Sequence, residues 1–518
     1  MAKSVNTSTI LICLFVSFGG FLFGYDTGLI SGILEMRAFK DDFGPGNGAQ
    51  VASHIKSLLV SILSVGTFVG SLVAGMLADK FGRRIAIMQS AAVFIVGVCL
   101  QTAGHNLGLM LPGRLIAGMG VGLLSGLIPL YQAEAAPKHL RGTLVSTYQL
   151  AITIGILAAF GINQGTQNIS GRASYRTPIG LQLFFASVLL IGMIFLPESP
   201  RNLLRQDKRD AALRALSRLR GRPPHDPLIV DEMQELESNL ALEAQIGEAQ
   251  SYADCFRGNA ARRTHIAVWI QMFQQLTGVN FVFYYGTTFF KQAGIKQAYL
   301  TSTITGVVNV LSTIPALWWV ERMGRRKLLI LGSMIMLVAQ LVVGVVGTAR
   351  APTLDPVTGD PIGNVDSNAG IVMIVFECLF IFGFASSWGP AAWVVSSEIF
   401  PLRLRSKGVA LATASNWFWN WALGFSTPYL VDVGEANLGA KIAFLWAAFI
   451  LAGGVFVYIF VPETKGLALE DVDEMFTSGI SARNSSKYIV KDKHNPNPNA
   501  NRLAGAKSDM TLDEEPRV

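Results

Sequence analysis

Twelve stretches of about 20 mostly apolar residues follow one another along this chain of 518 residues. A helix needs about 20 such residues to cross the hydrocarbon core of a bilayer. Only 15% of the residues are charged, whereas soluble domains carry about 25%. The sequence therefore predicts an all-α polytopic membrane protein. Its twelve transmembrane helices are expected at residues 9–34, 57–77, 85–103, 110–132, 144–163, 179–196, 264–290, 299–320, 328–348, 370–396, 408–430 and 440–461.

Polar segments divide the chain into four parts. We expect an N-terminal six-helix half at 1–196, a cytoplasmic loop at 197–263, a C-terminal six-helix half at 264–461 and a cytoplasmic tail at 462–518. Within the loop, apolar residues recur at helical spacing among charged ones, which predicts two short amphipathic helices, at 207–220 and 231–243, that brace the halves. The tail is rich in Asn, Pro and Lys and is expected to be mostly disordered.

Lysine and arginine residues are distributed unevenly between the two sides of the predicted membrane domain. Nine of the 42 lie in the odd-numbered connections, and 32 of the other 33 lie on the opposite side, together with both termini. Cytoplasmic connections carry an excess of positive charge, so both termini and the long loop are expected in the cytoplasm, and the protein in the plasma membrane. The same topology explains the net charge of +7, and we expect no nucleic-acid partner.

Three short motifs occur twice, once in each half and in the same order. The pairs are Asp79–Arg84 (DKFGRR) with Glu321–Arg326 (ERMGRR), Glu134–Pro137 followed by Arg141 with Glu398–Pro401 followed by Arg405, and Pro197–Ser199 (PES) with Pro462–Thr464 (PET). Two parallel six-helix halves related in this way are a recurring plan of membrane transporters. The repeat therefore predicts two six-helix halves of the same plan.

The ordered set of motifs resembles that of the sugar porter family of the major facilitator superfamily, and of its fungal hexose and monosaccharide transporters in particular. The likeness runs over roughly residues 8–470 and includes Gln274–Asn280 (QQLTGVN), Pro197–Arg201 (PESPR) and Pro462–Gly466 (PETKG). The resemblance implies the major facilitator fold, with a central site between two six-helix halves and transport by alternating access. We expect the chain to function as a monomer in the lipid bilayer.

A sugar carries many hydroxyl groups and no charge, so its site must offer paired hydrogen-bond donors and acceptors beside flat apolar faces. Amide and Trp side chains suit this task, and most of those at membrane depth lie in the second half. The candidates are Gln149, Gln274, Gln275, Asn280, Asn309, Trp393, Asn416, Trp417 and Asn420. The resemblance implies sugar contact at all of them except Trp417 and Asn420. The alternative for each single amide is a hydrogen bond between helices.

Three charged residues, Asp26, Arg114 and Glu377, lie well inside predicted spans. A charge at that depth costs at least a few kcal/mol and marks a functional candidate. The resemblance implies that the spans of Asp26 and Arg114 face each other, so that the two can pair. Protonation of Asp26 would break this pair and bias the conformation, which is a device for proton coupling. A purely structural ion pair is the alternative. For Glu377 the resemblance implies support of the inner gate.

Charged residues of the repeated motifs lie at the inner ends of the predicted helices. They are Asp79, Arg83, Arg84, Glu134, Arg141, Glu198, Glu321, Arg325, Arg326, Glu398, Arg405 and Glu463. Opposite charges at one depth can latch the two halves in an outward-open state and separate in the inward-open state. The alternative is that these residues serve only membrane topology and helix capping.

These observations predict transmembrane transport of a monosaccharide, a hexose such as glucose, with a proton as co-substrate. A facilitative hexose uniporter, a porter for a polyol, quinate or disaccharide, and a sugar sensor remain as alternatives. The sequence contains no P-loop, no His-Glu-x-x-His and no Gly-x-Ser-x-Gly motif, which argues against an enzyme or an ATP-driven pump. The four cysteines lack metal-ligand spacing, and we expect neither a metal nor a cofactor.

Overall fold

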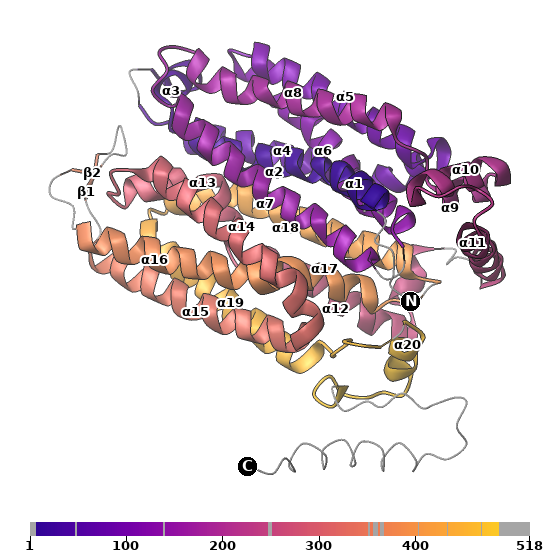
Figure 1. Ribbon diagram of the computed structural model, residues 1–518. Coiled ribbons are helices and arrows are strands. Elements are labelled where there is room, and N and C mark those ends of the chain that lie inside the picture. Colours follow the sequence, from indigo (N-terminus) through magenta and orange to yellow (C-terminus); the bar gives the residue numbers. More distant parts are fainter. Residues whose placement is uncertain are drawn as a thin grey trace, which may run out of the picture.

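The computed structural model in Figure 1 describes residues 7–46, 49–137, 140–246, 251–350, 353–355, 361–362, 367–401, 403–432, 434–467 and 469–485. Its helices run side by side in one bundle, and the N-terminal half forms one layer of it and the C-terminal half the other. The described strands, β1 (Thr353–Leu354) and β2 (Pro361–Ile362), pair antiparallel in a connection at one end of the bundle.

The N-terminal half contains six membrane-length segments. They are α1 (Thr7–Val16) continued by α2 (Phe18–Ile33), α4 (Ser53–Phe81), α5 (Arg83–Ala103), α6 (Leu107–Ala135), α7 (Arg141–Thr166) and α8 (Ala173–Phe195). The short α3 (Arg37–Phe43) follows α2. Each of these spans contains a helix predicted from the apolar runs.

The C-terminal half also contains six segments, two of which are interrupted. They are α12 (Gly258–Leu276) with α13 (Val279–Gln292), α14 (Ala298–Met323), α15 (Arg325–Ala349), α16 (Ser367–Gly383) with the π-helical turn η2 (Phe384–Trp388) and α17 (Gly389–Glu398), α18 (Arg405–Val431), and α19 (Ile442–Phe460) after the short η3 (Gly439–Lys441). The seventh span breaks at Gly278, which has a φ of 87°, a value that favours glycine.

Ten helices of the described chain are long and apolar enough to cross a membrane. The two segments that complete the predicted twelve are α12 with α13, and α18. The seventh span is divided at Gly278 into two shorter helices, and α12 carries Gln271, Gln274 and Gln275. The helix α18 carries Asn416 and Asn420. The spans that hydropathy detects least well are therefore those that hold most of the candidate site.

Close helix contacts within the N-terminal half depend on a stripe of glycines. Gly20, Gly24, Gly28 and Gly32 face α7, and a Cβ atom added at Gly24 would lie 1.9 Å from the carbonyl oxygen of Ile152. Small residues spaced by four allow such approach in membrane bundles. The halves meet along α2 with α13, α4 with α18, and α7 with α14.

Large apolar side chains point outward along the helices. Met76, Phe184 and Phe195 each expose more than 60% of their surface. An extensive exposed apolar surface marks a region that other apolar matter covers, and acyl chains of lipids serve this purpose for a bundle of membrane-length helices.

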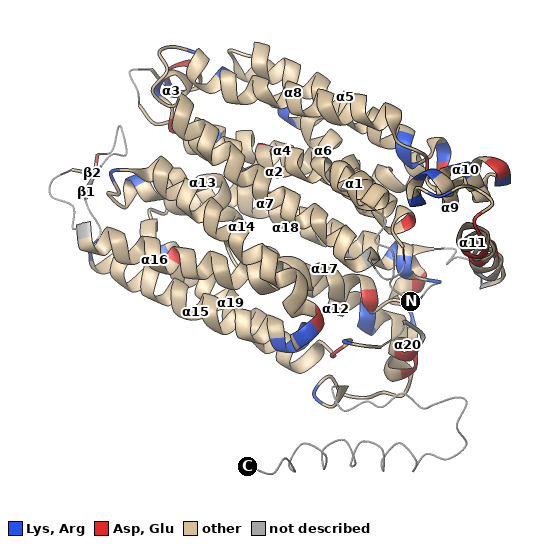
Figure 2. Ribbon diagram, viewed as in Figure 1, with Lys and Arg blue, Asp and Glu red and all other residues tan. Residues whose placement is uncertain are grey.

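The two ends of the bundle differ in charge. The end that we name the loop end holds the start of α1, the helices α9 (Pro200–Arg205), α10 (Arg209–Arg220) and α11 (Pro227–Ile246), η1 (Tyr252–Phe256), and α20 (Leu469–Thr477). Basic and acidic residues gather at this end in Figure 2. The far end holds α3 and the β1–β2 pair.

Two buried arginines attach the polar segments to the bundle. Arg220 of α10 donates to the carbonyl of Ala135 at 2.8 Å and pairs with Glu232 of α11. Arg263 of α12 pairs with Asp473 of α20 at 2.6 Å. The predicted loop helices correspond to α10 and α11, which join the N-terminal half. The tail contains the docked α20, which the sequence analysis missed, and residues 486–518 lie outside the described chain.

Candidate functional site

A connected cluster of amide side chains lies where α12, α13 and α18 meet, at the break of the seventh span. Asn416 donates to both Gln271 and Gln274 at 2.7 Å, and accepts from Gln275 at 3.1 Å. The side-chain oxygen of Gln275 accepts from Asn280 and, at 3.3 Å, from Asn420. Five of the predicted sugar-binding residues are therefore brought together in one network.

Gln271 belongs to this network but was not predicted. Its nitrogen donates to Ser396 at 3.2 Å while its oxygen accepts from Asn416. The spacing of Gln271, Gln274 and Gln275 is i, i+3, i+4, which places all three on one helix face. This spacing in the sequence is the signal by which Gln271 could have been found.

Two amides of the cluster, Gln274 and Asn416, use both of their N–H groups on protein atoms. The nitrogen of Gln274 donates to the carbonyls of Trp388 and Gly389, at 2.9 and 3.0 Å, where the π-helical turn displaces the regular ladder. Asn416 also uses both of its N–H groups on protein atoms. An amide has only two N–H groups, so in this conformation Gln274 and Asn416 have no donor left for a ligand.

Other members of the predicted site keep free capacity. Gln275 uses one of its two N–H groups, and Asn280 uses one and is only partly buried. Asn309 on α14 is 3% exposed, and no hydrogen bond of its side chain occurs within the described chain. Gln149 and Trp393 are partly buried. These five side chains retain polar groups for a sugar, and Asn420 likewise donates with only one of its two N–H groups.

The two tryptophans beside the cluster differ in their hydrogen bonding. Trp417 packs edge to face on Phe23 of the opposite half, with ring centroids 5.4 Å apart, and its Nε1 has no acceptor among the described residues. Trp388 of the π-helical turn is fully buried. Its Nε1 donates to the carbonyl of Leu329 at 3.1 Å and to Ser333 at 2.9 Å. Trp417 therefore keeps a free donor at the junction of the halves, and Trp388 does not.

Asp26 and Arg114 are buried in the N-terminal half, with exposures of 0% and 2%. Within the described chain, no group lies in hydrogen-bonding geometry with either carboxylate oxygen of Asp26 or with Nε of Arg114, although the amide of Gln182 is close enough to act on the carboxylate. No ion pair within 4.0 Å joins the two, although Arg114 acts on the carboxylate electrostatically. The direct pair expected between them is therefore not formed in this conformation.

An arginine at the start of the third and ninth spans organises the charges of each half at the loop end. In the N-terminal half, Arg83 pairs with Glu134 at 3.0 Å and with Asp79 at 3.5 Å. The backbone N–H groups of Arg83 and Arg84 donate to Glu198 at 2.9 and 3.0 Å. Glu198 thereby caps the N-terminus of α5, where a negative charge is favourable.

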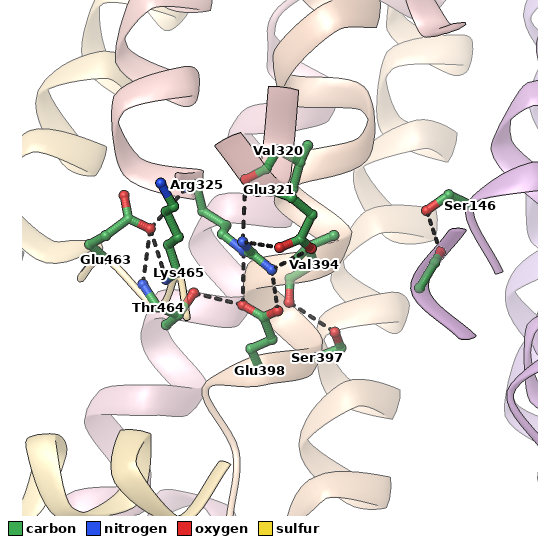
Figure 3. Close-up of polar contacts among 11 residues, drawn as sticks. Ser146, Val320, Glu321, Arg325, Val394, Ser397, Glu398, Glu463, Thr464 and Lys465 are labelled. Carbon is green, nitrogen blue, oxygen red and sulfur yellow. Dashed lines mark hydrogen bonds and ion pairs between the residues drawn. The ribbon is translucent and has the colours of Figure 1, made fainter. Parts of the chain in front are cut away.

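The C-terminal half repeats this arrangement around Arg325, as Figure 3 shows. Arg325 pairs with Glu398 at 2.8 Å and with Glu321 at 2.9 Å, and its backbone N–H donates to Glu463 at 2.9 Å. In this view Ser146 of α7, from the other half, stands apart and bonds to its own helix.

Glycine is required in both copies of the motif. Gly82 and Gly324 have φ angles of 87° and 86°, which disfavour other residues. A Cβ atom at Gly82 would lie 2.6 Å from Oε2 of Glu198, and one at Gly324 would lie as close to Glu463. The repeated GRR triplet thus encodes a turn that brings a carboxylate onto the N-terminus of the next helix.

Arg84 and Arg326 bind carbonyl groups at the ends of helices in their own halves. Arg84 donates to Met193 near the end of α8 at 3.0 Å, and Arg326 to Tyr458 near the end of α19 at 2.6 Å. The hydrogen bonds and ion pairs described for these arginines and for the cluster carboxylates each join residues of the same half. Among these residues of the described chain, no contact links the two halves in this conformation, and the latch stays a prediction for the opposite one.

Three further residues of the predicted gate have other positions. Glu377 is 3% exposed in α16, and 21 residues separate it from Glu398. At 1.5 Å per residue this places it roughly 30 Å from the loop end, so it does not join the charge clusters there. Gln340 of α15 is the polar side chain that acts on it. Arg405 begins α18, and the side chain of Arg141 lies outside what the structure describes.

The far end is closed by contacts between the halves that the sequence analysis did not predict. Lys56 of α4 pairs with Asp432, just after α18, at 3.0 Å, and Ser53 donates to the same carboxylate at 2.9 Å. The side chains of Lys56 and Asp432 are only 4% and 8% exposed. More than 370 residues separate the two in the chain, and no local sequence pattern links them.

A second bridge at the far end centres on Glu35, which follows α2. Its carboxylate pairs with Lys40 at 2.7 Å and accepts from Thr288 of α13 at 2.8 Å, while Lys291 lies at 3.4 Å. Burial raises the pKa of Glu35, but Lys40 and Lys291 lower it by more, to about 2. Because the pKa is depressed, this bridge is fully charged above the usual pKa near 4.5 and would be lost only as the pH falls towards 2.

The comparison with known sequences agrees with these observations. The model of the Sugar (and other) transporter family matches residues 12–476. Major facilitator-type transporter ecdD of Aspergillus rugulosus is 46% identical, over 92% of this chain and 89% of its own. Probable glucose transporter rco-3 of Neurospora crassa is 43% identical, over 93% of this chain and 82% of its own. High glucose sensor RGT2 of Saccharomyces cerevisiae is 43% identical over 94% of this chain, which spans 63% of the sensor's length.

Solved structures with the same fold include two of the xylose transporter XylE from E. coli. The proton:xylose symporter XylE bound to 6-bromo-6-deoxy-D-glucose is 28% identical, with a TM-score of 0.73 over 91% of this chain and all of its own. A partially occluded inward open conformation of XylE gives a TM-score of 0.72 over 89% of this chain, again at 28% identity and over all of its own. The all-α polytopic fold predicted from the sequence is confirmed.

Proposed function

Because this chain belongs to the sugar transporter family of the major facilitator superfamily, we propose that it carries a hexose such as glucose across a membrane together with a proton. The observation that carries the proposal is the amide cluster at the broken seventh span, which keeps unused donors and acceptors on Gln275 and Asn280. An uncharged polyhydroxyl ligand needs such groups beside apolar rings. The chain is a transporter and not an enzyme.

The residues of the cluster divide between two roles. The residues that contact the sugar in the proposed complex are those whose polar groups remain available, namely Gln275, Asn280, Asn309, Gln149, Trp393 and Trp417. Gln274 and Asn416 hold the cluster in place, because their donors are already bound to protein atoms. This division assigns the alternative role weighed in the sequence analysis, a hydrogen bond between helices, to Gln274 and Asn416.

Orientation and conformation follow from the two ends of the bundle. We infer that the loop end faces the cytoplasm, because it gathers the basic residues, and that the membrane is the plasma membrane. The far end is sealed by buried contacts between the halves, whereas the charge clusters at the loop end stay within their halves. The conformation is therefore taken as inward-facing, one of the two states of alternating access.

Proton coupling is assigned to Asp26 and Arg114. The Asp26 carboxylate is fully buried and has no hydrogen-bond partner within the described chain. A charged group without partners is costly in such a place, and protonation removes the charge. In the outward-facing state we expect Asp26 to approach Arg114, so that binding a proton from outside releases Arg114 and permits the loaded protein to turn inward.

Uptake of labelled glucose by cells that lack their own hexose transporters tests the function. We expect saturable uptake that a protonophore abolishes, that glucose epimers inhibit, and that quinate, inositol and disaccharides do not inhibit. If quinate, inositol or a disaccharide inhibited uptake and hexoses did not, the inhibiting compound and not a hexose would be the substrate. The similarity to a glucose sensor makes sensing the second candidate, and a chain that changes hexose-dependent gene expression without any uptake would establish it.

Substitution of the available amides should weaken sugar binding. Gln275→Ala or Asn309→Ala removes the buried hydrogen bond that the amide donates to the sugar in the proposed complex, which is worth about 1–3 kcal/mol. Since about 1.4 kcal/mol is a factor of ten, the half-saturation concentration for hexose should rise roughly tenfold. Initial uptake rates over a range of glucose concentrations measure this.

The matched control is Gln101→Ala. Gln101 is fully buried and bonds to the carbonyl of Gly113 inside the N-terminal half, so its loss should lower the amount of protein but not the affinity of what remains. Normal affinity in both Gln275→Ala and Asn309→Ala would mean that these amides only join helices.

A further inference from the structure

We propose that Ser64 of α4 is a positioning residue that makes the sugar-binding amides respond to closure of the far end. Its hydroxyl donates to Oδ1 of Asn420 on α18 at 2.7 Å, and both side chains are buried, with exposures of 1% and 3%. Through this bond the N-terminal half reaches the amide cluster of the C-terminal half. The inference rests on the proposed sugar site.

The bond from Ser64 fixes which way the Asn420 amide points. Oδ1 of Asn420 accepts from Ser64 and, at 3.1 Å, from the hydroxyl of Tyr284, so the nitrogen must face the other way and donates to Gln275. A tyrosine hydroxyl can also accept a hydrogen bond. Without Ser64, Tyr284 would therefore tolerate either orientation of the amide, and the bond to Gln275 would no longer be enforced.

Gln275 transmits this orientation to the groups that remain available for a ligand. Its Oε1 accepts from both Asn420 and Asn280, and its nitrogen is held on one side by Asn416. The free N–H of Gln275 and the free groups of Asn280 are thus aligned by a chain of bonds that starts at Ser64. A site aligned before the ligand arrives binds more tightly.

The alignment depends on the conformational state because α4 and α18 belong to different halves. Along the same seam, Lys56 pairs with Asp432, and Ser57 donates to the carbonyl of Phe425 at 2.7 Å. When the halves rock apart at the far end, Ser64 moves away from Asn420 together with these contacts. The amides are therefore aligned when the far end is closed and free to rotate when it is open. As a result, the carrier binds sugar with a different affinity at each of its two faces.

The test compares Ser64→Ala with Ser57→Ala in sealed membrane vesicles of both orientations. Both variants lose one hydroxyl from the α4–α18 seam, but only Ser64 is bonded to the amide cluster. With labelled glucose as the probe, Ser64→Ala should raise the half-saturation concentration at the loop-end face by about threefold to tenfold, as expected for one buried hydrogen bond. The half-saturation concentration at the far-end face should stay unchanged, and Ser64→Thr, which keeps the hydroxyl, should restore the wild-type value.

The outcomes separate this inference from the proposed function. A wild-type chain that transports no hexose in either vesicle orientation would remove the proposed function and the inference together. Wild-type transport with equal effects of Ser64→Ala and Ser57→Ala, or with the same change at both faces, would leave the function standing and overturn the role of Ser64. If Ser64→Thr is poorly expressed, the comparison of the two alanine variants decides alone.

Discussion

Asp26→Asn is expected to abolish uphill accumulation of sugar while leaving exchange and downhill movement at least partly intact. Asp26 is completely buried and makes no hydrogen bond in the described chain, so its negative charge is costly there. In the proposed mechanism, a proton that neutralises it is bound together with the sugar. Asn imitates the protonated acid at every pH. The accumulation ratio of a labelled, non-metabolised hexose should fall to about one, and addition of sugar should no longer alkalinise the medium.

The wild-type chain and a second buried acid serve as controls for this experiment. Accumulation by the wild type should increase as the outside becomes more acidic, since more protons are available to bind. Glu377→Gln removes a buried acid of the other half and should keep accumulation. Wild-type uptake that ignores pH and protonophores would make the protein a facilitator. Full accumulation by Asp26→Asn would move the proton site to Glu377.

Loss of one partner of the buried pair between Lys56 and Asp432 should shift the carrier strongly towards the outward-facing state. Removal of one member of a buried ion pair costs about 3–5 kcal/mol, because it leaves the other charge buried and unpaired. Lys56→Gln or Asp432→Asn should therefore change the ratio of the two states more than a hundredfold. A cysteine introduced at Ser61, which is 2% exposed in the same seam, reports the change as faster alkylation from the outside.

Two comparisons isolate the ion pair. The double variant Lys56→Met with Asp432→Leu removes both charges and should shift the states far less than either single variant, which a double-mutant cycle quantifies. Arg172→Gln breaks a pair with Asp42 at the same end but within one half, and should leave the alkylation rate unchanged. Equal rates in the wild type and both single variants would show that the pair does not hold the far end closed.

The architecture could be predicted because membrane spans are encoded locally. Apolar runs predicted the twelve segments, and the repeated motifs predicted the two halves.

Two features could not be predicted by the same local reasoning. The polar composition of the tail concealed α20, in which the buried Val472, Met475 and Phe476 recur at helical spacing among charged residues. The break at Gly278 lies inside an apolar run, and only the backbone shows that the chain turns there.

The candidate site could be predicted as a set of residue types but not as a network. Gln274, Gln275 and Asn416 were selected by their amide chemistry and their depth in the membrane. The use of the Gln274 donor depends on carbonyls released at Trp388 and Gly389, which the sequence does not reveal. The bridges at the far end join residues from opposite ends of the chain. Such pairs depend on how the halves are docked, and docking changes with the transport state.

The attachment of α20 decides where the membrane domain ends for the purpose of protein engineering. Arg263 is 3% exposed and forms an ion pair with Asp473, and its guanidinium lies 4.5 Å from the ring centre of Phe476. If the chain were cut just after the last span, Arg263 would lose both its ion-pair partner and the aromatic ring that covers it. Arg263 lies in the first part of α12, the helix that carries the amides. A fluorescent reporter fused directly after residue 461 would report an unstable protein, whereas one fused beyond residue 485 would leave the seventh span anchored.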